Sequence, residues 1–415
     1  MTPGDRSAYS SQRRRTLLGC ILAQNLMIGL SYGTFGALLE QNQAHFDVGR
    51  TTMTAAMSFI SLTLALGSSL AGSLIPRFRP RDLMLTGIAI AAVAYAGLVF
   101  TTAFWQALIC FTMIGTGVAF SAIISPVALI TRWFPEGPGK PLGLVHLPIL
   151  MLSVPFVSGL LLDDVGRAGI YAGVAGLLLL ALPVLAVLIR NPPAEAADGS
   201  VSGANPADGV VLGIGVLLRS PSFWLISLAI GLLAGSGTVA VVHLVPFGME
   251  RGLPQVSAAA LLSVFAAAGL FGTPLFGRLA DRIGALNALA LSAALAGLMW
   301  TMLPFLMGNP IFFAVALLGA ASSPLVALHG ASVRAVFGPV AAARAMGYGY
   351  LVKLPFLFGF PIIAALLFEI TGNYRLPYLL CGMSLACATI CAIGVTVLRL
   401  RAGGPAIADP AAQAA

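Results

Sequence analysis

Charged residues are scarce in this sequence of 415 residues. Asp, Glu, Lys and Arg make up 9% of it, against about 25% in an average soluble protein. Hydrophobic residues make up 59%, and the mean hydropathy is +0.97. A soluble chain of this length needs a charged surface. The composition therefore excludes an ordinary cytosolic enzyme, a disordered chain and a disulfide-rich secreted domain.

Motifs for metal binding and catalysis are missing too. The five cysteines lie in apolar stretches without a Cys-x-x-Cys pair, so we expect no metal site, no disulfide and no cofactor. There is no phosphate-binding loop, no His-Glu-x-x-His and no nucleophile–base pair, so we expect no enzyme. The net charge of +8 comes from arginines scattered between apolar runs, which argues against nucleic-acid binding.

What the sequence does contain is long apolar runs. Each is long enough for a transmembrane helix, which needs about 20 mostly apolar residues, and too continuous for a transmembrane strand. Arg13, Arg14 and Arg15 precede a first run that is too long for a cleavable signal peptide. We predict an all-α membrane protein with twelve spans, at 16–39, 51–75, 83–101, 104–134, 141–163, 168–190, 221–247, 256–280, 285–307, 310–335, 343–369 and 376–398. Prolines inside these spans, among them Pro126, Pro148 and Pro324, are expected to bend helices.

The basic residues predict the topology. All of them fall in the tails and in alternate loops on one side, except Arg50, Arg167, Arg251 and Arg375 on the other side and Lys353 inside a span. The excess of basic residues marks the cytoplasmic side. We therefore expect a multi-pass protein of the bacterial inner membrane with both termini in the cytoplasm.

One polar stretch divides the chain. Residues 191–219 are rich in Pro, Ala, Gly, Asp and Ser and indicate a flexible linker. We predict an N-terminal six-helix bundle over 1–190, a cytoplasmic linker over 191–219 and a C-terminal six-helix bundle over 220–415. A weak repeat, 72–81 in the first half and 277–284 in the second, indicates pseudo-symmetry between the bundles.

The second copy of this repeat carries a family resemblance. Gly277-x-Leu-x-Asp281-Arg282-x-Gly284 resembles the motif that follows spans 2 and 8 in major facilitator superfamily transporters. The resemblance implies that fold and a gating role for Gly277, Asp281 and Arg282. The alternative is that Arg282 only sets the topology. The first copy has Pro76 where the motif has aspartate.

A narrower resemblance is to the monocarboxylate and oxalate/formate transporter branch. It rests on Ser-Tyr-Gly-Thr-Phe-Gly (31–36), Arg-Trp-Phe-Pro (132–135) and Val-His-Leu-Val-Pro-Phe (242–247). In that branch a basic residue of span 11 binds carboxylate, and Lys353 matches this position. A buried ammonium needs water, an anion or loss of its proton. Tyr350, three residues before, could pack on an organic anion. The alternative is that Lys353 reaches the cytoplasmic interface.

One position departs from the branch. Span 8 commonly carries an arginine there, and this chain has Thr273. A single lysine with neutral donors suits one carboxylate better than two, so we expect a monocarboxylate. Thr273 could donate a hydrogen bond to it, or could only pack between helices.

Other polar residues within spans complete the candidate site. Histidine titrates near neutral pH, so His243, His329 and His146 are candidates for proton coupling, and His329 also for substrate binding. Their alternatives are a rim residue, an interhelical bond and a packed residue, respectively. Asn25, Tyr32 and Ser125 could contact substrate or bond helices together.

Together these features predict a monomeric secondary transporter. We expect it to move a small organic anion by alternating access, with proton symport or anion antiport. The alternatives are an exporter of hydrophobic or drug-like compounds and a non-transporting membrane sensor. A buried lysine disfavours cationic cargo.

Overall fold

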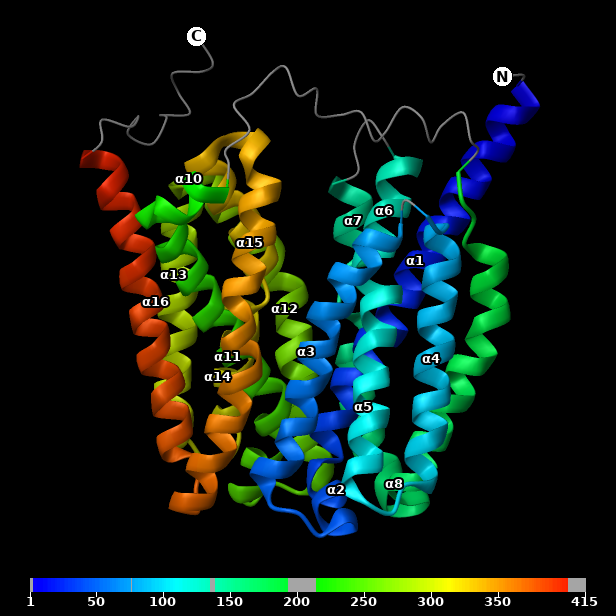
Figure 1. Ribbon diagram of the computed structural model, residues 1–415. Coiled ribbons are helices and arrows are strands. Elements are labelled where there is room, and N and C mark those ends of the chain that lie inside the picture. The colour runs from blue at the N-terminus through cyan, green and yellow to red at the C-terminus, as the bar shows by residue number, and fades with distance from the viewer. Residues whose placement is uncertain (1–2, 76, 135–138, 193–213, 402–415) are drawn as a thin grey trace. The chain divides into compact units, whose positions relative to one another are not determined.

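The computed structural model describes residues 3–75, 77–134, 139–192 and 214–401 (Figure 1). Within these ranges the chain is helical and contains no strand, which confirms the predicted all-α membrane class. The chain forms two compact units, residues 1–205 with 241–263 and residues 206–240 with 264–415. The bundle boundaries at 190/191 and 219/220 stay a prediction.

The first part of the chain forms eight described α-helices and one π-helix. They are α1 (Pro3–Ala37), α2 (Leu39–Phe46), α3 (Arg50–Leu74), α4 (Pro80–Phe100), α5 (Phe104–Val118), the π-helix η1 (Ala119–Ile123), α6 (Ile124–Trp133), α7 (Gly139–Val145) and α8 (Ile149–Leu188).

The remaining described helices follow the linker. They are α10 (Ile214–Arg219), α11 (Pro221–Glu250), α12 (Gln255–Ile283), α13 (Ala285–Met302), the 3-10 helix η2 (Leu303–Phe305), α14 (Pro310–Ser322), α15 (Leu325–Thr371) and α16 (Arg375–Arg401). The end of α11 and the start of α12 belong to the first unit.

The described residues contain eleven helical segments that are long and apolar enough to cross a membrane. One of them, Pro141–Leu188, has 48 residues. At 1.5 Å per residue this is about 70 Å, more than twice the hydrocarbon thickness of about 30 Å. Gly166, with φ 64°, breaks the helix in the middle. The segment therefore contains the predicted span 141–163 and all but the last two residues of the span 168–190, and the structure agrees with twelve spans.

A glycine with positive φ also divides α15. Its 47 residues are interrupted at Gly338, which has φ 77°. Positive φ is a conformation that glycine adopts without strain. The chain thus turns between two helical limbs of α15, 325–337 and 339–371. The first limb covers the end of the predicted span 310–335, and the second limb covers the predicted span 343–369.

Two predicted spans are less regular than expected. The span 141–163 is broken at residues 146–148, between α7 and α8, and the span 310–335 is broken at 323–324, between α14 and α15. Pro148 and Pro324 stand at these breaks. Proline lacks an N–H group and disfavours helix at the residue before it.

The π-helix interrupts the predicted span 104–134. Residues 119–123 form one π turn, and Pro126 follows three residues later. Single π turns inside α-helices are frequent at functional sites. Ser121 lies within this turn and Ser125 two residues after it, and both are buried.

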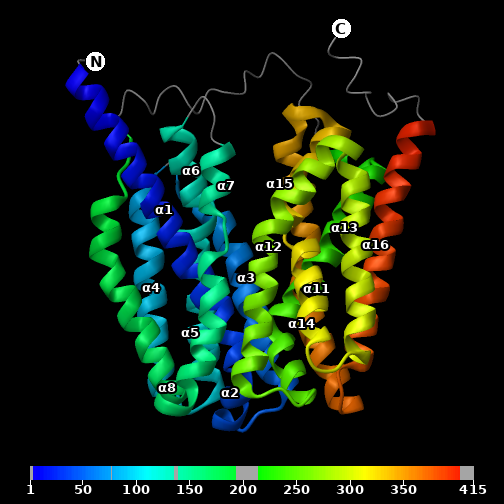
Figure 2. The same ribbon diagram turned by 180° about the vertical axis from the view of Figure 1, so that it is seen from behind.

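Packing in the first unit is between long neighbouring helices. α8 lies beside α1 and α4, and α5 lies beside α3 and α4 (Figure 2). The end of α8 is held by Arg81, which donates to the carbonyl oxygens of Ile189 (2.8 Å) and Ala186 (2.7 Å). Trp133 Nε1 donates to Arg190 O at 2.9 Å. Arg81, expected only as a topology marker, therefore also caps a helix.

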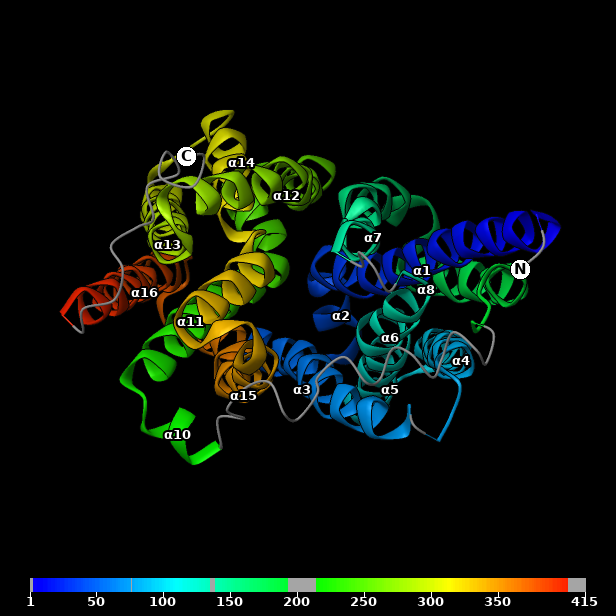
Figure 3. The same cartoon turned by 90° about the horizontal axis from the view of Figure 1, so that it is seen from above.

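Packing in the second unit centres on α13, which lies beside α16 and α14 (Figure 3). Trp300 of α13 is fully buried and meets the ring of Tyr378 of α16 edge to face, with 4.6 Å between ring centroids. These helices support the limbs of α15, which carry the residues described next.

Candidate functional site

Lys353 is buried in the second limb of α15. Its side chain is 2% exposed and is one of the largest fully buried side chains of the described chain. Neighbours in sequence are apolar, from Leu351 to Phe356, apart from Lys353 itself. A lysine head group within a membrane span is expensive unless it faces a polar partner. Lys353 therefore does not reach the interface as a solvated side chain, which was the alternative to a site residue.

α11 packs closely against this limb of α15. A Cβ on Gly231 would lie 2.6 Å from the ring of Phe356, and a Cβ on Gly235 would overlap the ring of Phe360. Glycine at these positions lets the phenyl rings of α15 approach the backbone of α11. This contact turns one face of α15 toward α11. Gly349 and Lys353 lie on the same face of α15 as the two phenyl rings.

His329 and Ser227 converge on Gly349. The position that a Cβ on Gly349 would take lies 3.0 Å from His329 Nε2 and 3.3 Å from Ser227 Oγ. His329, on the first limb of α15, is fully buried, and Ser227, on α11, is 1% exposed. Gly349 lies one helical turn before Lys353 and so on the same side of the helix.

His329 and Lys353 are also close enough to interact electrostatically. The second unit thus brings together a buried ammonium, an imidazole and a hydroxyl. We call Ser227, His329 and Lys353 the polar cluster. Such a set can pair with a carboxylate and hydrogen-bond a neighbouring polar group.

Sequence reasoning missed Ser227. The signal that could have found it is the spacing of Ser227, Gly231 and Gly235, which puts three small residues on one face of α11. Small residues every four positions mark close helix contacts in membranes.

Two further candidates belong to the second unit. Thr273 is half-buried, and its hydroxyl donates to Gly269 O at 3.0 Å within α12. The side chain of Tyr350 lies outside the described residues, and its predicted packing on an anion stays a prediction.

The remaining substrate candidates lie in the first unit. Asn25 accepts hydrogen bonds from the backbone N–H groups of Ile149 (2.7 Å) and Leu150 (3.1 Å) and so caps α8. Its amide is therefore already used within the fold. Tyr32 lies beside Ser61. Ser125 is fully buried, and its hydroxyl has no hydrogen-bond partner among the described residues.

Two of the three histidine candidates also lie in the first unit. His243, near the end of α11, is fully buried. His146 stands in the break between α7 and α8 and is exposed. Only His329 shares a unit with Lys353. The proton-coupling role of each stays a prediction.

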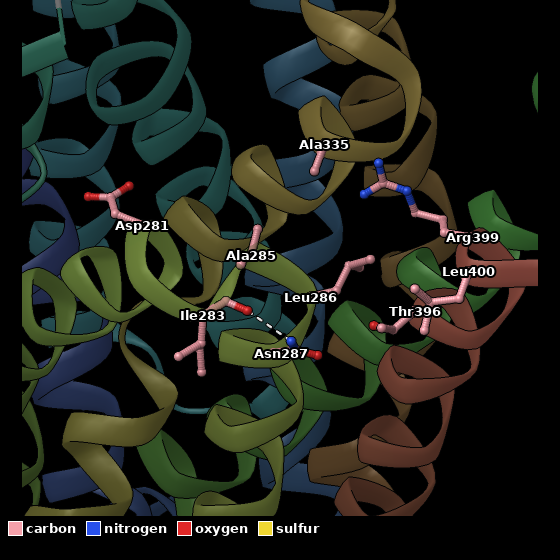
Figure 4. A pocket seen from close by; sticks show the side chains of 10 residues that line it. Asp281, Ile283, Ala285, Leu286, Asn287, Ala335, Thr396, Arg399 and Leu400 are labelled. Carbon is pink, nitrogen blue, oxygen red and sulfur yellow. Dashed lines mark hydrogen bonds between the residues drawn. The ribbon is translucent and has the colours of Figure 1, made fainter. Parts of the chain in front are cut away.

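The predicted gating residues lie at the end of α12. Asp281 lines a cavity of about 420 Å³ with residues of α13, α15 and α16 (Figure 4). Arg399 stands on the opposite margin from Asp281, as Figure 4 shows. Arg282 is exposed. Among the described residues, no atom lies within 4 Å of the position that a Cβ on Gly277 would take, so Gly277 marks no close contact with them.

A metal site was not expected. Among the residues that the structure describes, there is no group of three or more His, Cys, Asp or Glu side chains that could hold a metal ion.

Comparison with known proteins identifies the family. Residues 21–313 match the family description of the Major Facilitator Superfamily. The chain is 25% identical over 351 residues to the oxalate:formate antiporter of Oxalobacter formigenes, covering 80% of each chain. It is 28% identical over 184 residues to monocarboxylate transporter 12 of Rattus norvegicus, covering 43% of this chain and 37% of that one.

Other similarities are broader. The chain is 26% identical over 404 residues to the agnestins efflux protein AgnL12 of Paecilomyces divaricatus, covering 92% of this chain and 86% of the relative. Its fold is similar to that of the crystal structure of a bacterial homologue of the human lysosomal transporter Spinster, with a TM-score of 0.77 and 14% identity. That match covers 94% of this chain and 98% of the other.

Proposed function

The chain belongs to the Major Facilitator Superfamily and is a membrane transporter rather than an enzyme, and we propose that it moves a small organic monocarboxylate across the bilayer by alternating access. The observation that carries the proposal is Lys353, a cation 2% exposed inside a membrane-spanning helix. A group of this kind marks a substrate or ion pathway in most membrane proteins.

The charge of the cluster suits one carboxylate. In the polar cluster only Lys353 carries a full positive charge when His329 is neutral, and Ser227 adds an uncharged donor. One carboxylate neutralises one ammonium, whereas a second carboxylate would enter a low-dielectric site without a matching charge. Thr273 stands where the resembled branch commonly carries an arginine, so this chain lacks that second cation.

The relatives support this substrate class. An oxalate:formate antiporter and a monocarboxylate transporter, by their names, carry small carboxylates. We propose that this chain, like them, works on an anion of that class, coupled to a proton or to a counter-anion. Tyr350, Tyr32, Ser125 and Thr273 remain candidates for further substrate contacts.

The membrane arrangement is part of the proposal. We place the protein in a bacterial inner membrane as a monomer, with both termini in the cytoplasm. We propose that two bundles, 1–190 and 220–415, alternate access to the substrate and that Gly277, Asp281 and Arg282 have a gating role. The distribution of arginines between loops supports this orientation.

A second function is favoured by one observation. The efflux relative covers more of this chain than either carboxylate transporter does. The rival proposal is therefore an exporter of hydrophobic or drug-like compounds. Export of drug-like compounds from cells that express the chain would support the exporter. Uptake of carboxylates by the purified protein would support the carboxylate transporter instead.

Replacement of Lys353 tests the carboxylate proposal. Uptake of monocarboxylates into proteoliposomes should fall at least tenfold in Lys353→Gln, because a hydrogen bond to a charged group contributes about 1.5–3 kcal/mol. Lys353→Arg keeps the charge and should retain part of the uptake. Arg334→Gln, which removes an exposed cation from the same helix, should transport normally. Unchanged uptake by a folded Lys353→Gln protein would refute the assignment.

A further inference from the structure

The polar cluster contains more hydrogen-bonding capacity than a carboxylate needs. Lys353 supplies the charge, and His329 and Ser227 meet one helical turn away, at Gly349. One turn of α-helix advances about 5.4 Å. A carboxylate held by Lys353 therefore leaves the imidazole and the hydroxyl near another part of the same small molecule.

A fourth polar residue adjoins the polar cluster. Ser332 lies three residues after His329 on the first limb of α15, and residues three apart are neighbours on a helix surface. Ser332 is fully buried, and its hydroxyl has no hydrogen-bond partner among the described residues. A buried unsatisfied hydroxyl in a native fold calls for a partner such as water or a ligand.

The close approach at Gly349 keeps these groups in place. A Cβ there would lie 3.0 Å from His329 Nε2, so His329 rests directly against the backbone of the second limb. The neighbouring residue Gly330 meets Met346 of that limb in the same way, with 3.4 Å from the position of its Cβ to the sulfur. The two limbs of α15 are therefore in close contact at His329 and Gly330.

We propose that Ser227 and Ser332, which both lie next to His329, are specificity-determining residues that bind a second, uncharged polar group of the substrate. The inference rests on the proposed function. It narrows the substrate class to small monocarboxylates that also carry a hydroxyl, keto or amide group. A saturated acid of the same length would leave the buried hydroxyl of Ser332 unpaired, and a site built to bond a polar group rejects an analogue that lacks it.

Matched ligands test the inference. Binding of butyrate and of 2-, 3- and 4-hydroxybutyrate to the purified protein would be measured by isothermal titration calorimetry. We expect at least one hydroxy acid to bind ten times or more tightly than butyrate. Ser227→Ala and Ser332→Ala should each lower this ratio toward one, with the affinity for butyrate changed less than twofold.

Ser236→Ala is the control variant. Ser236 is also buried in α11, and its hydroxyl already donates to Leu233 O at 2.9 Å. This variant should keep the preference of the native protein. A Ser227→Ala protein that fails to fold would be replaced by Ser227→Thr, which keeps the hydroxyl and should keep the preference.

The outcomes separate the inference from the proposed function. Equal binding of butyrate and every hydroxybutyrate, with loss of both in Lys353→Gln, would overturn the inference and leave the carboxylate site standing. A hydroxy-acid preference that survives both serine replacements would also overturn it, because another group would then bind the hydroxyl of the ligand. Absence of binding for every carboxylate would overturn the inference together with the proposed function.

Discussion

Replacement of Gly349 by alanine tests the geometry of the polar cluster directly. The added methyl group would lie 3.0 Å from His329 Nε2, 3.2 Å from His329 Cε1 and 3.3 Å from Ser227 Oγ. These separations are shorter than ordinary van der Waals contacts, so His329 and Ser227 must move by a few tenths of an ångström. Insertion of a methyl group into a packed site usually destabilises by about 1–3 kcal/mol.

Gly359→Ala is the matched control. Gly359 lies in the same limb of α15, and the Cβ there would meet only Ile363 Cδ1, at 3.9 Å. Glycine in a helix interior is about 0.5–1 kcal/mol less favourable than alanine. Gly359→Ala should therefore raise stability slightly. Gly349→Ala has the same gain in helix stability, but its methyl group also meets His329 and Ser227 too closely. We therefore expect Gly349→Ala to be about 1–3 kcal/mol less stable than the control.

The assay combines stability with anion binding. Thermal unfolding of the purified variants gives the difference in stability, and titration with a monocarboxylate gives the affinity. We expect Gly349→Ala to unfold at a lower temperature than Gly359→Ala and to bind the anion more weakly. Gly359→Ala should bind like the native protein.

A double-mutant cycle identifies the residue responsible. In a His329→Ala background the imidazole that meets the new methyl group is gone, so Gly349→Ala should lose most of its penalty. The effects of two mutations on stability are non-additive when the residues are in contact, and they add when the residues are distant. Equal stability and equal affinity of Gly349→Ala and Gly359→Ala would refute the placement of His329 against Gly349.

Two predictions concern α8. Arg81→Ala should destabilise the protein by about 1–3 kcal/mol because two carbonyl groups lose a charged donor. The control is Arg77→Ala, which replaces an exposed arginine four residues earlier and should unfold at the native temperature. Equal unfolding temperatures of the two variants would contradict the capping role. Asn25→Ala should lose about 0.5–2 kcal/mol of stability, as removal of a helix cap does, and the affinity for anion at a temperature where the variant is folded should stay native. A large loss of anion affinity with native stability would instead make Asn25 a substrate contact.

The membrane spans could be predicted from the sequence because the bilayer imposes them locally. Every backbone polar group in the hydrocarbon must be bonded within its own helix, so a run of about 20 apolar residues is enough to predict a span. The turns at Gly166 and Gly338 fall between predicted spans. Their cause is local too, because glycine adopts positive φ without strain. The breaks at Pro148 and Pro324 were expected only as bends.

Lys353 could also be predicted from the sequence, because a cation within a span is conspicuous against apolar neighbours. Its neighbours could not. His329 lies 20 positions before Gly349 and Ser227 more than 100 positions before it, and no sequence pattern brings them to one glycine. The roles of Asn25 and Arg81 likewise depend on helices that are distant in the chain.

The sequence by itself therefore determined the class, the spans and the one cation that topology does not explain, because hydrophobicity and charge act residue by residue against the bilayer. Only the tertiary structure decided that a serine of α11 and a histidine of α15 meet beside that cation, that Asn25 caps α8, and that Arg81 holds its end. These contacts depend on side-chain packing between helices that are remote in sequence, where a difference of one methyl group decides whether two residues can touch.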